Sequence, residues 1–139
     1  MKDSEKKELI AAALAALKNA YAPYSGFKVA AAVLTDSGKL FTGVNVENAS
    51  YPAGICAERN AISHAVAEGE TKLKAIAIVG GAGGKVETYC APCGICRQVM
   101  REFADPAEIT VIVAISEEDY REYTLSELLP ESFGPEFLI

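Results

Sequence analysis

Three cysteines in two distant parts of the chain constrain the fold more than any other feature. Cys56 stands where an apolar helical pattern begins, and Cys93 and Cys96 open a second helical pattern further on. Pro92 supports that second start, because proline fits the first turn of a helix and not its interior. Cys93 and Cys96 then share one face of the first turn. A fold that uses all three thiols together must bring two helix N-termini into contact.

These side chains suit a catalytic zinc ion, which takes three protein ligands and keeps a fourth position for water. Cys56, Cys93 and Cys96 supply three thiolates, and the positive ends of the two helix dipoles favour their ionised form. Glu58 remains free to carry protons, and the neighbouring thiolates should raise the pKa of its carboxyl. Arg59 is predicted to donate hydrogen bonds to sulfur and so to withdraw charge from the thiolates.

Other residues leave alternatives open. Cys90 stands three residues before Cys93 and could be a fourth ligand of a closed structural site, if the extended chain folded back over the metal. His64, the only histidine, follows Cys56 by eight residues. That spacing corresponds to about 12 Å along a helix axis at ~1.5 Å per residue, too far to share the metal. Arg97 is either a second donor to sulfur or a solvated helix residue.

Length and composition indicate one globular domain over residues 1–139. Half of the residues are hydrophobic and only 23% are charged, which excludes a disordered chain. The net charge is −6 and no cluster of Lys and Arg is present, so nucleic acid is not an expected partner. No apolar run is long enough for a membrane span, and no signal peptide is recognisable at the start. We therefore expect a cytoplasmic protein whose cysteines serve metal binding or catalysis.

Hydrophobic periodicity predicts an α/β fold. Helical patterns cover residues 4–21, 56–68 and 93–103, with a helical turn at 126–129, and strand patterns cover 28–35, 40–46, 74–79, 109–115 and 120–124. Ser4 is the expected cap of the first helix, and Tyr21 is expected on its apolar face. The glycines from Gly80 to Gly84 are predicted to form a loop, since their spacing does not match a phosphate-binding motif. Apolar strands that alternate with helices indicate a mixed sheet covered on both faces.

At this point the motifs resemble a known family. Cys56-Ala-Glu-Arg together with Pro92-Cys-Gly-Ile-Cys-Arg is similar to the signature of the zinc nucleoside and nucleobase deaminases. The stretches 21–27, 44–49 and 128–135 resemble the small homotetrameric cytidine deaminases in particular, so the likeness covers nearly the whole chain. It implies a three-layer αβα sandwich with a five-stranded mixed sheet and one zinc per subunit. It also implies a homotetramer whose active sites are shared between subunits.

The resemblance implies roles for residues outside the metal centre. Phe27 would pack on the base, Asn45 and Glu47 would hold the ribose, and Phe133 would enter from another subunit. Ala57 is small enough for its backbone to approach the substrate. Asn45 and Glu47 stand two apart at a predicted strand end and therefore share a face. An amide and a carboxylate suit a sugar hydroxyl, and the carboxylate would repel a 5′-phosphate, which favours a free nucleoside.

The sequence therefore predicts zinc-dependent hydrolysis of cytidine and 2′-deoxycytidine to uridine and 2′-deoxyuridine with release of ammonia, a reaction of pyrimidine salvage. Ala91 and Asn60 depart from the family pattern, and Cys90 is an additional thiol, so substrate preference is left open. One alternative is a deaminase of another aminopyrimidine nucleoside such as blasticidin S. The other is a zinc-binding structural module without catalysis.

Overall fold

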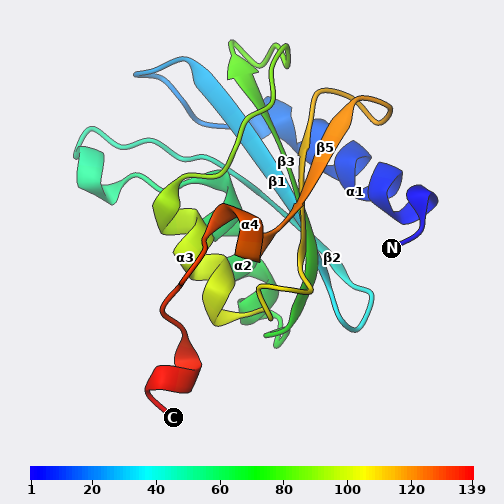
Figure 1. Ribbon diagram of the computed structural model, residues 1–139. Helices are drawn as coiled ribbons and strands as arrows, with labels where there is room; N and C mark the ends of the chain where they lie inside the picture. The colour runs from blue at the N-terminus through cyan, green and yellow to red at the C-terminus, as the bar shows by residue number, and fades with distance from the viewer.

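A computed structural model describes residues 1–139 and contains one five-stranded sheet of order β2-β1-β3-β4-β5 (Figure 1). Its strands are β1 (Phe27–Thr35), β2 (Leu40–Val44), β3 (Leu73–Ala82), β4 (Thr110–Ala114) and β5 (Tyr120–Thr124). β3 and β4 run parallel, and every other pair of neighbours is antiparallel. The predicted mixed sheet is thus confirmed.

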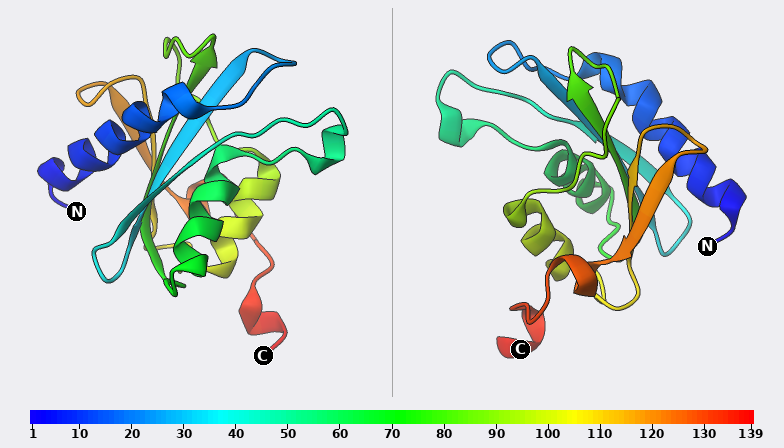
Figure 2. Two further views of the ribbon diagram at one scale, coloured as in Figure 1. Left: turned by 180° about the vertical axis from the view of Figure 1, so that it is seen from behind. Right: turned by 45° about the horizontal axis from the view of Figure 1, so that its top comes forward.

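Helices cover both faces of this sheet (Figure 2). The α-helices are α1 (Asp3–Ala16), α2 (Ala57–Ala67), α3 (Gly94–Glu102) and α4 (Leu125–Leu128), and the short 3-10 helices are η1 (Leu17–Asn19), η2 (Tyr51–Ala53) and η3 (Pro135–Phe137). α1 lies on one face, and α2 and α3 lie side by side on the other. The predicted three-layer αβα sandwich is therefore confirmed.

Alternating side chains of the strands build a separate core under each helical layer. The face under α1 is rich in alanine, and these small side chains let the helix lie close to the sheet. Its buried residues include Leu9, Ile10, Ala13, Ala30, Ala32, Ala75 and Ala77. The opposite face carries larger aliphatic side chains under α2 and α3, including Val33, Ile62, Ile76, Ile78, Met100 and Val111.

The approach of α2 to the edge strand β2 depends on Gly43. A Cβ atom at Gly43 would lie 2.2 Å from the backbone nitrogen of Ala61 and 2.7 Å from the carbonyl oxygen of Ala57. Asn60 joins the same two elements, because its Nδ2 donates to the carbonyl of Val44 at 2.7 Å. This contact fixes the first turn of α2 relative to the sheet.

Some predicted boundaries are wrong. α1 begins before Ser4, because the backbone amide of Lys2 donates to the carboxylate of Glu5 at 3.0 Å and caps the helix two residues earlier. Tyr21 is 55% exposed, since the chain has left the helix and pairs there with Val46. The start of the predicted glycine loop is instead the end of β3, in register with β1. None of the helices combines the length and apolarity that a bilayer span requires.

Candidate metal centre

The two helices on one face of the sheet bring three thiols together. Cys56 is the N-cap residue of α2, Cys93 is the N-cap residue of α3, and Cys96 lies in the first turn of α3. All three sulfur atoms lie within 4.8 Å of one another, and those of Cys56 and Cys93 are 3.9 Å apart. Sulfurs bound to one tetrahedral zinc ion at ~2.3 Å stand about 3.8 Å apart. The group therefore fits a single zinc ion.

Burial and helix position act differently on two of these thiols. Burial raises the pKa of Cys93, but hydrogen bonds from the backbone amide and thiol of Cys96, the thiol of Cys56 and the amide of Ile95 together outweigh it, so that the pKa of Cys93 is lowered overall. Burial raises the pKa of Cys96, and the nearby charges of Glu58 and Cys56 raise that pKa further. A bound cation opposes the effect at Cys96, because coordination favours the thiolate.

Glu58 lies directly beside this group and is only 4% exposed. Burial raises the pKa of its carboxyl, although hydrogen bonds from its own backbone amide and from Cys96, and the charge of Arg59, act in the opposite direction. The thiolates were the predicted cause of the raised pKa, whereas in the structure burial is its main cause. A carboxyl group whose pKa is raised in this way is suited to carry a proton back and forth.

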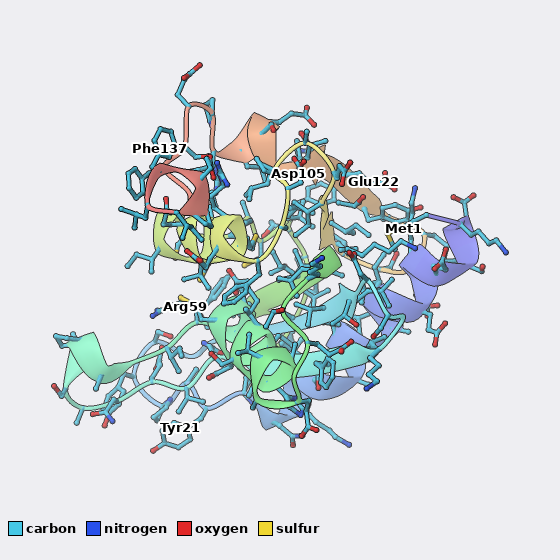
Figure 3. The ribbon with its side chains drawn as sticks, turned by 90° about the horizontal axis from the view of Figure 1, so that it is seen from below. Met1, Tyr21, Arg59, Asp105, Glu122 and Phe137 are labelled. Atoms are coloured by element: carbon cyan, nitrogen blue, oxygen red, sulfur yellow. The ribbon has the colours of Figure 1, made fainter.

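Arg59 reaches from α2 toward the sulfurs, and Figure 3 shows it between the two helices. Its Nη2 donates to the sulfur of Cys56 at 3.8 Å, while its Nε is buried without a partner in this chain. Arg97 makes no such contact. Its Nε donates to the carbonyl of Pro92 at 2.8 Å, and its Nη1 donates to the carbonyl of Leu128 at 2.7 Å. This guanidinium therefore joins the residue just before Cys93 to the end of α4.

The remaining metal candidates lie outside the three-thiol group. The ring Nδ1 of His64 stands 3.2 Å from the carbonyl of Thr42, and the ring packs edge-on against Phe41. Cys90 is half-buried, and burial, with the charges of Glu58 and Cys56, raises the pKa of its thiol to about 11.

Asn45 and Glu47 follow the end of β2, where Asn45 contacts the start of β1 and Glu47 contacts the residues just before β1. Asn45 accepts from the amide of Val29 at 2.9 Å and donates to the carbonyl of Phe27 at 2.8 Å. Glu47 accepts from the hydroxyl of Ser25 and from the amides of Tyr24 and Ser25. A carboxylate can accept about four hydrogen bonds, and a side-chain amide can make about four as donor or acceptor. Each side chain therefore keeps at least one free hydrogen-bonding position for a ligand.

A cavity of about 340 Å³ opens beside Glu47. Tyr24, Ser25 and Tyr51 line it, and sequence reasoning assigned a role to none of them. The signal that was missed is the hydroxyl residue two positions before Phe27. A larger cavity of about 550 Å³ lies by the C-terminal end of α3 and contains none of the predicted site residues.

The other predicted contacts differ in accessibility. Phe27 is exposed at the start of β1, next to Asn45. Ala57, the first residue of α2, is fully buried in this chain. Phe133 is exposed on the segment after α4, where its carbonyl accepts from Gln98 of α3 at 2.9 Å. The roles of these residues remain predictions.

Comparison with known proteins places this geometry in context. Residues 3–114 match the model of the cytidine and deoxycytidylate deaminase zinc-binding region. A cytidine deaminase of Halalkalibacterium halodurans is 43% identical over 132 residues, which cover 95% of this chain and 96% of that protein. The crystal structure of cytidine deaminase from Burkholderia pseudomallei is 47% identical with a TM-score of 0.81 and covers 91% of this chain and 97% of that one. The crystal structure of cytidine deaminase from Mycobacterium tuberculosis is 38% identical with a TM-score of 0.78, and the match covers 91% of this chain and 95% of that one.

Proposed function

Because the chain belongs to the cytidine and deoxycytidylate deaminase family, we propose that it hydrolyses cytidine and 2′-deoxycytidine to the corresponding uridines and ammonia. The observation that carries this proposal is the buried carboxyl of Glu58 beside three thiols that fit one zinc ion. A structural zinc site has no use for a buried carboxyl group beside its ligands, whereas hydrolysis needs a group that both accepts and donates protons.

The proposed reaction divides the work between the metal and the carboxyl group. When bound, zinc supplies a water molecule that is activated for attack at neutral pH. Glu58 takes a proton as the water oxygen bonds to C4 of cytosine, and it delivers that proton to N3. It then transfers the second proton to the 4-amino group, and the C4–N bond breaks to release ammonia. Arg59 stabilises the thiolate of Cys56 through the contact described above.

Substrate binding is proposed to use the residues at the start of β1 and the end of β2. Asn45 and Glu47 hold ribose hydroxyls, Phe27 packs on the base, and the backbone of Ala57 contacts it. The hydrogen bonds from Ser25 and Tyr24 to Glu47 support this proposal, because they orient the carboxylate before substrate arrives. Contacts confined to the far side of the ribose do not distinguish ribose from 2′-deoxyribose, so both nucleosides should react.

We further propose that residues 1–139 act as one domain, with one zinc per subunit, in a cytoplasmic homotetramer that serves pyrimidine salvage. Exposed aromatic side chains support the assembly, since such patches mark interaction surfaces. They include Tyr24 and Tyr51 beside the cavity and Phe133 on the C-terminal segment. Phe133 is proposed to enter the site of a neighbouring subunit. The four free cysteines are compatible with a reducing compartment.

The test measures the fall in ultraviolet absorbance on cytidine together with ammonia release and zinc content. Glu58→Gln should keep the zinc and the fold but lower turnover by at least about a hundredfold, because it removes the proton carrier. Glu68→Gln, the same change at the exposed end of the same helix, is the control and should retain full activity. A wild-type protein that holds zinc but deaminates no pyrimidine nucleoside would contradict the proposal. Higher turnover of blasticidin S than of cytidine would favour the alternative substrate.

A further inference from the structure

Side chains on the outer side of α3 hold the C-terminal tail, which comprises the residues after α4. Arg101 Nε donates to the hydroxyl of Ser132 at 2.8 Å, and its Nη2 pairs with the carboxylate of Glu136. One turn earlier, Gln98 holds the carbonyl of Phe133. Figures 1 and 2 show the tail passing along α3 and projecting beyond the body of the chain.

Arg101 and Gly134 are in direct contact. Arg101 is only 9% exposed, and a Cβ atom at Gly134 would lie between 2.2 and 2.5 Å from three atoms of its guanidinium group. Any side chain at this position would therefore displace the guanidinium from its two partners. Charged residues are seldom buried unless they are paired, so the pairing with the tail accounts for a buried arginine here. We call Arg101, Ser132, Gly134 and Glu136 the tail clamp.

Beyond Leu129, which packs partly buried against the core, the tail has little else to hold it in place. Gly134 is its only buried residue. Phe133 and Phe137 stack on each other with ring centroids 5.1 Å apart, yet they remain 55% and 63% exposed. Polar contacts with α3, and not burial of apolar side chains, therefore set the position of this aromatic pair.

We propose that Arg101 is a positioning residue for the substrate site: the tail clamp fixes the tail, and thereby fixes the place from which Phe133 reaches the site of a second copy of this chain. The inference rests on the proposed function, in which Phe133 contributes to a neighbouring site. Arg101 itself does not touch the substrate.

Two substitutions disrupt the clamp from opposite sides in the zinc-loaded protein. Arg101→Gln removes the guanidinium, and Gly134→Ala pushes it away without changing any charge. If the tail is then docked for about a tenth of the time, the KM for cytidine rises about tenfold while kcat is unchanged, because apparent affinity scales with the competent fraction. Hydrogen exchange of the tail amides should become faster in the same variants, because the undocked fraction rises, with unchanged zinc content. Arg101→Lys, which keeps the charge next to Glu136 but not the planar fork, should be intermediate.

Lys6→Gln is the matched control. Lys6 pairs with Glu122 at 2.6 Å between α1 and β5, on the other side of the sheet, and its loss should change neither KM nor tail exchange. If Arg101→Gln does not fold, the double variant Ser132→Ala, Glu136→Ala removes the same two contacts from the tail side and serves as the deciding test. Wild-type KM and tail exchange in the clamp variants would overturn the inference. A wild-type protein inactive on cytidine would instead refute the proposed function.

Discussion

Gly43 offers the sharpest test of how the fold positions the metal centre. Gly43→Ala places a methyl group against backbone atoms of α2, 2.2 Å from the nitrogen of Ala61 and 2.7 Å from the oxygen of Ala57. Backbone atoms of a helix cannot rotate out of the way as a side chain can. The helix must therefore move away from β2 as a unit.

The size of the effect follows from these distances. Moving the nearest contact from 2.2 Å to 3.4 Å, the lower end of ordinary van der Waals separation, needs a shift of about 1.2 Å. Overpacking of this kind costs about 1–3 kcal/mol of unfolding free energy. Because α2 begins at Cys56 and carries Glu58 in its first turn, a shift of this size should also lower kcat/KM for cytidine by roughly 100-fold.

Urea denaturation gives the loss of stability, and absorbance decay on cytidine gives the loss of activity. Gly94→Ala is the control, because it adds the same methyl group between two proposed ligands where no atom lies within 4 Å. Its unfolding free energy should stay within about 0.5 kcal/mol of wild type. The reasoning fails if Gly43→Ala keeps wild-type stability and activity, or if Gly94→Ala is the more damaging of the two.

Two further predictions concern the metal and the carboxylate of Glu47. Dialysis against a chelator should abolish deamination, and zinc should restore it. The circular dichroism spectrum should persist throughout, because the two buried cores consist mainly of aliphatic side chains; loss of the fold would instead indicate a structural zinc. The hydroxyl and amide of Ser25, with the amide of Tyr24, lower the pKa of Glu47 below its ordinary 4.5. These contacts therefore stabilise the fold above pH 4.5 and are lost as pH falls through the lowered pKa. Ser25→Ala should destabilise the protein at pH 7, and the difference in urea midpoint from wild type should shrink at pH 3.

Local signals were sufficient to predict the metal centre. Proline before Cys93, and helical periodicity after Cys56, placed both cysteines at helix starts, and each is an N-cap residue in the structure. The spacing of Cys93 and Cys96 within one turn then predicted that their sulfur atoms lie on the same face of the helix. Spacing along a helix also separated His64 from the sulfurs. The family and the fold followed from these motifs and are confirmed by the comparisons.

Contacts between distant segments could not be predicted in the same way. The contact of Gly43 with α2 depends on how closely a helix packs on an edge strand, and a lone glycine in a strand pattern does not reveal this. The pairing of Arg101 with Ser132 joins residues 31 positions apart, and that of Ser25 with Glu47 joins residues 22 positions apart. Neither pair has a periodic signature. The cause of the raised pKa of Glu58 was also missed, because burial is a property of the packed structure.

The balance of charge explains why this centre combines three thiolates with a carboxyl group. Three thiolates carry more negative charge than a divalent cation neutralises. An ionised carboxylate beside this negatively charged centre is therefore electrostatically unfavourable. Arg59 offsets part of this excess through Cys56, and the amides at the start of α3 stabilise the thiolate of Cys93. Glu58 is buried on the same side, where burial favours its neutral form. The carboxyl group can then hold a proton next to an anionic centre. In the proposed reaction it releases that proton when a nitrogen atom of the cytosine ring system becomes more basic. The features that offset the charge of the three thiolates therefore also suit Glu58 to its proposed role as a proton carrier.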